Sequence, residues 1–163
     1  MTHCKTMNAP IGRLLLEADE TGLCGLRLIG GKQTVQECTS PLLEEAACQL
    51  EAYFGGRRTA FELPLSLSGS AFDRAVWQQL LQIGFGQTRT YGQIAAALGK
   101  PNASRAVGAA CSRNLVWIVV PCHRVVAGDG KLTGFAGGME AKRRLLEHEG
   151  WRTGKDKLLG KQI

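Results

Sequence analysis

The sequence lacks the features that would place the chain in a membrane or in a disulfide-stabilised secreted protein. No stretch reaches the roughly 20 consecutive apolar residues of a membrane-spanning helix. Residues 1–5 carry no hydrophobic signal-peptide segment. The six cysteines include no Cys-x-x-Cys pair and show no secreted disulfide pattern. We therefore expect a cytoplasmic protein with reduced thiols and no membrane partner.

The composition is that of a soluble globular protein, but its charge is unevenly placed. The chain has 163 residues, of which 44% are hydrophobic and 21% are charged. Residues 1–66 carry a net charge of −2, whereas residues 67–163 carry a net charge of +8. A basic half predicts a polyanionic partner, with nucleic acid as the first candidate. The open alternative is a solvated surface with a basic tail over residues 152–163.

Local patterns predict two units with a boundary near residue 68. In the first, apolar runs over 11–18 and 23–29 flank the turn residues 19–22, which is typical of a hairpin. Residues 41–54 carry a helical apolar stripe that ends at a glycine pair. These patterns predict a small N-terminal α/β domain over residues 1–68, followed by a second domain over 69–151.

The second half contains two short helices joined by a tight turn. Ser70 is the expected N-cap of a preceding helix, and Thr90 with Gln93 forms a capping box at the start of the first of the pair. Ser104 is the expected cap of the second, over residues 105–111. A helix-turn-helix binds DNA in some proteins and is plain packing in others. The alanines and glycine of the second helix favour a narrow minor groove over base readout in the major groove.

An apolar run over residues 116–120 predicts a buried strand that ends at Pro121-Cys122-His123-Arg124. Burying polar side chains at the end of such a strand costs free energy unless they have hydrogen-bond or charge partners or take part in chemistry. The alternative is that Cys122 is an inert, buried structural cysteine.

These residues, with several neighbouring segments, closely resemble the alkylguanine-DNA alkyltransferases, also called methylated-DNA–protein-cysteine methyltransferases. The resemblance covers about residues 70–151, whereas the first 66 residues match more loosely. The segments that carry it are Thr90–Ala95, Arg105–Ala110, Asn114, Ile118–Val126, Gly134–Gly138 and Leu145–Gly150. It implies a ribonuclease-H-like N-terminal domain and a mainly helical C-terminal domain that carries the helix-turn-helix and an active-site cysteine loop.

The resemblance implies direct reversal of DNA damage. An alkyl group passes from O-6 of guanine, and from O-4 of thymine, to Cys122 as a thioether, once per chain and without a cofactor. A thiolate suits this displacement because it is a soft nucleophile. The resemblance makes His123 the base, acting through a water, and Glu149 the group that orients it. Asn114 is implied to hold the active-site turn.

The target base lies in a duplex and must be flipped out. The resemblance places Tyr91 beside the target phosphate and guanine ring, and Arg105 in the stack. The resemblance also implies that the carbonyls of Cys122 and Val125 read the exocyclic amine and that the N–H of Ala136 donates to O-6, with Gly137 allowing close approach. The other residues expected at the DNA are Ser104, Ala106, Gly108, Ala109, Arg113 and Arg124. The expected partner is double-stranded DNA bound through its minor groove by a monomer, with cooperative assembly left open.

Some positions depart from the family pattern. Leu115 stands where many members have proline, and Phe135 replaces a tyrosine. Trp117 lies where the family places a small residue or proline at the alkyl pocket, so we expect it to favour methyl over benzyl groups; the alternative is a core residue.

Some members bind zinc in the N-terminal domain. Here His3, Cys4 and Cys24 offer ligands, but Asp19 occupies one ligand position and a fourth histidine is missing. We therefore expect no metal.

Two other functions stay open from the sequence. A lesion sensor would bind DNA without covalent chemistry, although the sensor relatives replace the cysteine found here as Cys122. A cysteine hydrolase would also use Cys122 and His123, but adjacent residues of a strand point to opposite faces and cannot touch.

Overall fold

The computed structural model describes residues 2–133, 135 and 137–161, which fall into two compact units. The first comprises residues up to 68 together with 115–117, and the second comprises residues 69–114 and those from 118 onward. The expected pairing of an N-terminal α/β unit with a mainly helical C-terminal unit is confirmed.

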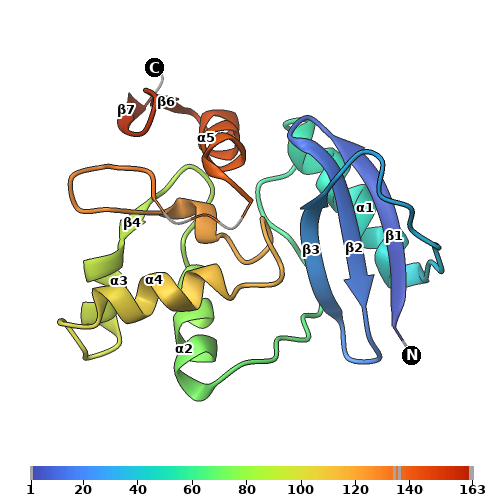
Figure 1. Cartoon of the computed structure of the whole chain (residues 1–163), viewed down its shortest axis with the longest axis horizontal. Coiled ribbons are helices and arrows are strands. Elements are labelled where there is room, and N and C mark those ends of the chain that lie inside the picture. Colours follow the sequence, from blue (N-terminus) through green and yellow to red (C-terminus); the bar gives the residue numbers. More distant parts are fainter. Residues whose placement is uncertain (1, 134, 136, 162–163) are drawn as a thin grey trace. The chain divides into compact units, whose positions relative to one another are not determined.

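The first unit is an antiparallel sheet with a helix packed on it (Figure 1). Strands β1 (His3–Ala9), β2 (Gly12–Ala18) and β3 (Leu23–Ile29) lie in the order β1-β2-β3, and α1 (Pro41–Phe54) contacts β1 and β2. Leucines of β2, β3 and α1 form the core between them. The predicted hairpin and helix are confirmed, whereas β1 was missed because its residues are mostly half-buried and several are polar.

The β2–β3 turn is joined to the connector that leads out of this unit. The Asp19 carboxylate accepts the N–H groups of Thr21 and Gly22, at 2.8 and 3.1 Å, and the hydroxyl of Ser66 at 2.6 Å. A Cβ on Gly22 would lie 2.5 Å from the Pro64 carbonyl oxygen, so only glycine fits where the connector runs beside β3.

The second unit is built mainly from helices. Helices α2 (Ala71–Leu80), α3 (Tyr91–Ala97) and α4 (Ser104–Ser112) pack on one another, and α5 (Met139–His148) lies against the turn that carries Cys122. Two short strands, β4 (Arg89–Thr90) and β5 (Val125–Val126), pair in parallel. Ser70 caps α2 and Thr90 with Gln93 forms the predicted capping box of α3. Ser104 is the first residue of α4 and makes no capping bond, which corrects that prediction.

The apolar run over 116–120 is not the strand that the sequence predicts. Val116 makes an isolated parallel bridge to Leu26, and the chain then turns through Ile118, whose φ of 71° is incompatible with extended backbone. Val116, Ile118 and Val120 are nonetheless buried. Burial alone accounts for the apolar composition, and a short apolar run does not reveal which backbone carries it.

The expected basic tail also has regular structure. Strands β6 (Trp151–Thr153) and β7 (Leu158–Lys161) pair antiparallel, and Trp151 and Leu158 pack on a small buried cluster formed by Val126, Leu132 and Leu146. The end of the described chain is therefore held by apolar contacts. None of the helices in the described part of the chain has the length and apolar character needed to cross a membrane.

Candidate active site

Cys122 opens a single turn of 3-10 helix, η1 (Cys122–Arg124), between Pro121 and β5. The N–H of Cys122 donates to the Val120 carbonyl at 2.8 Å, and the N–H of Arg124 donates to the Pro121 carbonyl at 3.0 Å. Successive side chains of a 3-10 helix leave the backbone about 120° apart. Cys122, His123 and Arg124 therefore point in three directions, although all three are buried.

Asn114 holds the loop that leads into this turn. Its side-chain amide donates to the Val120 carbonyl at 2.8 Å, and Asn114 is itself only 2% exposed. The same side chain is hydrogen-bonded to the Cys122 thiol. The structure thus brings Asn114 and Cys122 together, as the sequence predicts.

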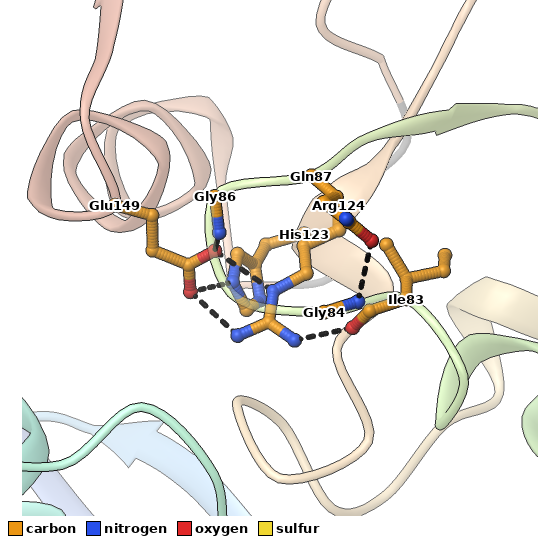
Figure 2. Close-up of polar contacts among 7 residues, drawn as sticks. All are labelled: Ile83, Gly84, Gly86, Gln87, His123, Arg124 and Glu149. Atoms are coloured by element: carbon orange, nitrogen blue, oxygen red, sulfur yellow. Dashed lines mark hydrogen bonds and ion pairs between the residues drawn. The ribbon is translucent and has the colours of Figure 1, made fainter.

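Glu149, directly after α5, gathers the two residues that follow Cys122 (Figure 2). One carboxylate oxygen lies 2.8 Å from His123 Nε2 and 2.9 Å from Arg124 Nη2, and the other lies 2.8 Å from Arg124 Nε. The N–H of Gly86 donates to the carboxylate at 3.2 Å, and Arg124 also donates to the Ile83 carbonyl at 2.6 Å. The carboxylate is thus surrounded by donors inside the protein.

The position of Arg124 corrects the prediction that it contacts DNA. Its side chain is only 6% exposed, and its donors are directed to Glu149 and Ile83. The sequence indicated that an arginine at the end of a buried apolar run needs a partner, and in the structure that partner is Glu149 and not DNA. The buried Glu149 carboxylate needs a permanent cation, and Arg124 supplies it.

Charge within this network is arranged so that His123 is neutral and Glu149 is ionised. Burial alone would raise the pKa of Glu149, but the hydrogen bonds and charges of His123 and Arg124 hold it below its usual range. Burial lowers the pKa of His123 below its ordinary 6.5, against the opposing effect of Glu149. A neutral imidazole that donates from Nε2 to Glu149 keeps a lone pair on Nδ1. Among the described residues, this buried Nδ1 has no hydrogen-bond partner.

The Cys122 thiol is protonated in this resting arrangement. Burial raises its pKa to about 11, and the hydrogen bond with Asn114 and the charge of Lys142 work in the opposite direction. Cys111, also buried, has its pKa raised to about 12 by the same desolvation. Cys122 therefore needs a base before it can act as a nucleophile at neutral pH.

Lys142 is a functional candidate that the sequence reasoning missed. It is 1% exposed, and its ammonium donates to the carbonyls of Val125 and Thr133 at 2.6 and 2.8 Å. Burial lowers its pKa to about 8. The signal was present in the sequence, because Lys142 lies three and four residues before Leu145 and Leu146 and so falls on the apolar stripe of α5.

Five of the residues expected at DNA border one cavity beside α4. A cavity of about 470 Å³ is bordered by Tyr91, Ser104, Arg105, Gly108, Ala109, Ser112 and Thr133. Arg105 and Ala106 are exposed on the same helix. The Tyr91 hydroxyl donates to the Thr133 carbonyl at 2.9 Å. Ser112 and Thr133 were not predicted, because a serine and a threonine carry no distinguishing pattern in the sequence.

Arg113 lies at the end of α4 but is engaged elsewhere. Its guanidinium makes two hydrogen bonds to the Asp73 carboxylate, at 2.9 and 2.6 Å. The side chain stays 54% exposed, so its predicted contact with DNA stays a prediction.

The remaining predicted substrate contacts are differently placed. Val125 is buried on β5 with its carbonyl bound to Lys142, and Gly137 is half-buried in a turn before α5. Ala136 lies outside the described residues. Trp117 belongs to the first unit, where its backbone N–H donates to the Leu26 carbonyl at 3.0 Å. Its place beside an alkyl pocket stays a prediction.

Within the described ranges, no group of three or more histidine, cysteine, aspartate and glutamate side chains is arranged to hold a metal ion. Asp19, which stands at one family ligand position, is instead occupied by its bonds to Thr21, Gly22 and Ser66.

Two family models match the chain. Residues 71–151 match the DNA-binding domain of 6-O-methylguanine DNA methyltransferase, and residues 2–67 match the ribonuclease-like domain of the same proteins. The second match agrees with the fold expected for the N-terminal unit.

Individual proteins match over most of their length. The methylated-DNA–protein-cysteine methyltransferase of Methanosarcina acetivorans is 46% identical, over 87% of this chain and 94% of its own. The crystal structure of Mycobacterium tuberculosis O6-methylguanine methyltransferase has a TM-score of 0.82 at 44% identity, covering 91% of this chain and 93% of that one. A structure of the same organism's protein in complex with DNA also has a TM-score of 0.82, at 44% identity, covering 90% and 92%.

Proposed function

The chain belongs to the 6-O-methylguanine DNA methyltransferase family, and we propose that it repairs DNA by moving an alkyl group from guanine O-6 to Sγ of Cys122. The observation that carries this assignment is the buried Cys122–His123–Arg124 turn, in which a thiol adjoins a histidine that is paired to an ionised carboxylate. O-4 of thymine presents the same leaving oxygen and is a second substrate of the proposed reaction.

The reaction begins with the proton of Cys122. Neutral His123 has an acceptor on Nδ1, while Glu149 holds its Nε2–H and stabilises the positive charge that develops on the ring. Nδ1 makes no direct bond to the thiol, so one bridging water carries the proton, as the family resemblance implies. Arg124 keeps Glu149 ionised throughout.

The thiolate then attacks the alkyl carbon. A bond forms between sulfur and carbon, the bond between carbon and O-6 breaks, and its electron pair returns to the guanine, which takes up one proton. No electrons are exchanged with an outside carrier, so the transfer needs no cofactor. The thioether offers no good leaving group, and each chain therefore acts once.

Lys142 supports both the nucleophile and the base pocket. Its ammonium lies close enough to Cys122 to favour the thiolate, and it holds the Val125 carbonyl that is expected to accept the exocyclic amine of guanine. A carbonyl has two lone pairs, so Val125 can accept from both groups.

Double-stranded DNA is the partner of the second unit, whose part of the chain carries the positive net charge. The α4 face presents small residues for approach to the minor groove, with Arg105 exposed to replace the flipped base and Tyr91 at the cavity border. In this proposal the chain binds DNA as a monomer, and cooperative assembly on DNA stays open.

Intact-mass spectrometry after mixing with a duplex that contains one O6-methylguanine tests the proposal. The expected result is a permanent gain of one methyl per chain, mapped to Cys122, that Cys122→Ser abolishes while DNA binding persists. Cys111→Ser is the matched control and keeps the transfer. Binding without a mass change would indicate a lesion sensor, and turnover of an ester or amide would indicate a hydrolase.

A direct cysteine–histidine hydrolase is disfavoured by the geometry, although not for the reason that the sequence suggested. Cys122 and His123 lie in a 3-10 turn, not on a strand, and their divergence in that turn separates the thiol from Nδ1.

A further inference from the structure

Two cysteines of the first unit, Cys4 and Cys38, are paired by a backbone bridge. The N–H of Cys4, on β1, donates to the Cys38 carbonyl at 2.9 Å, and the N–H of Cys38 donates to the Cys4 carbonyl at 3.0 Å. Cys38 lies just before α1, 34 positions along the chain, so only the fold brings the two together.

This reciprocal bonding determines how far apart the two residues are. Directly opposed residues that exchange both hydrogen bonds in an antiparallel pair have Cα atoms about 5.5 Å apart and side chains on the same face. Disulfides span Cα separations of about 4.4–6.8 Å. Closing the bond requires both side chains to rotate and the exposed segment before α1 to move closer to β1, because the Cβ atoms of an opposed pair lie about 4.5–5.5 Å apart and those of a disulfide about 3.5–4.5 Å apart.

The surroundings of the pair favour thiol chemistry. Cys38 is exposed, and its sulfur lies 3.7 Å from Nδ1 of His3, an imidazole that can accept the thiol proton. Cys4 is half-buried, and its thiol donates to the Gln36 carbonyl at 3.2 Å. Cys111 and Cys122 are buried and therefore less accessible to a dissolved oxidant.

A metal is a weaker interpretation of the same residues, because the described part of the chain holds no cluster of three suitable ligands. We propose that Cys4 and Cys38 form a redox pair that closes to a disulfide in the presence of a low-molecular-weight disulfide such as oxidised glutathione.

The exchange balances in two steps. The Cys38 thiolate attacks one sulfur of glutathione disulfide, forming a mixed disulfide and releasing one glutathione thiol. The Cys4 thiolate then attacks Cys38 Sγ and releases the second. The protein loses two electrons and two protons, and the oxidant gains them. The closed bond ties the segment before α1 to β1 and leaves the thiol used for repair reduced.

The test treats the full-length native chain with oxidised glutathione, blocks the remaining thiols and maps disulfides by peptide mass spectrometry. The expected product is a Cys4–Cys38 cross-link with a loss of two hydrogens. Cys4→Ser and Cys38→Ser each prevent it, and Cys48→Ser, which removes an exposed thiol on α1, leaves it unchanged. His3→Gln slows closure several-fold near neutral pH.

Stable glutathione adducts without the cross-link, or a cross-link that involves Cys24, would overturn the proposal. The oxidised protein is then given methylated duplex. Methyl uptake at Cys122 by the cross-linked chain is expected, and the two Ser variants keep it. Because cross-linking and methyl uptake are read in separate peptides, failure of one proposal is distinguishable from failure of the other.

Discussion

The two units differ in what they bury. In the described residues of the first, the buried side chains are apolar except for Gln49, which bonds the backbone of Glu62 in both directions. Among the described residues of the second unit, six polar or charged side chains are buried: Asp73, Asn114, His123, Arg124, Lys142 and Glu149.

This difference separates a scaffold from a reactive site. Burial of an apolar side chain stabilises a fold. Burial of a charge destabilises it, because the charge loses its hydration, unless a partner compensates for that loss. The second unit meets that cost with Arg124 for Glu149 and with two carbonyls for Lys142. Such arrangements are typical of sites where protonation states are controlled for chemistry.

The largest effect is expected from Arg124→Met, which leaves the Glu149 carboxylate buried without its cation. The free energy of unfolding should fall by about 3–5 kcal/mol. Arg143→Met is the matched control, because Arg143 pairs with exposed Glu140, and its loss should be below about 1 kcal/mol. Urea denaturation measures both. Equal losses of unfolding free energy in the two variants would mean that the buried pair of Arg124 and Glu149 stabilises the fold no more than the exposed pair does.

Arg105→Ala should separate base flipping from chemistry. If Arg105 replaces the extruded base, its loss slows repair of duplex by an amount set by unstacking, about 1–3 kcal/mol, which is roughly fivefold to 150-fold in rate. Reaction with free O6-methylguanine should change little. Single-turnover methyl transfer measures both rates, and equal slowing on both substrates would assign Arg105 to the fold or pocket.

Duplex binding measured across salt concentrations tests the charge asymmetry of the two halves. Duplex binding should weaken steeply as salt rises, because bound counterions are released when lysines and arginines contact phosphates. A flat salt response would mean that the basic half is not the DNA face.

Lys142→Met removes a buried cation but keeps its packing volume. Methyl transfer should slow by roughly tenfold to a hundredfold, since a hydrogen bond to a charged group contributes about 1.5–3 kcal/mol. Lys142→Arg should restore part of the rate by supplying a positive charge near Cys122. A Met variant that folds and transfers methyl at the wild-type rate would remove Lys142 from the site.

The pH dependence should reflect the lowered pKa of His123. Because burial lowers that pKa below 6.5, the imidazole is still an effective base at pH 6.5, and the transfer rate should fall only at more acidic pH. The unfolded chain takes up this proton near pH 6.5 and the folded chain does not, so stability also declines as pH falls below that value. Rate and unfolding measurements between pH 5 and 8, roughly the window in which histidines titrate, test this. A rate midpoint above 6.5 would contradict it.

The smallest effect is expected from Trp117→Ala. This variant tests whether Trp117 serves the scaffold of the first unit or the reactive site of the second. Trp117 belongs to the first unit by its backbone hydrogen bond, yet the family resemblance places it at the alkyl pocket. We expect the wild type to take benzylguanine poorly and the variant to take it faster, while methyl transfer is unchanged. Rapid benzyl transfer by the wild type, or loss of folding in the variant, would make Trp117 a core residue of the scaffold.

The sequence by itself determined the features that depend on neighbouring residues. The turn at 19–22, the caps at Ser70 and Thr90 and the helix over 41–54 follow from local hydrogen bonding and local periodicity, so they are visible in a short window. The cysteine motif and its spacing to Asn114 and Glu149 likewise identified the family.

Only the tertiary structure decided which charges are buried. The local patterns around Arg124 and Lys142 do not name the partners of these cations, and their roles appear once Glu149 and the Val125 carbonyl are placed beside them. The backbone of 116–120 and the bridge between Cys4 and Cys38 were decided in the same way. The physical reason is that burial and long-range hydrogen bonds depend on segments far apart in the chain, whose positions no local pattern encodes.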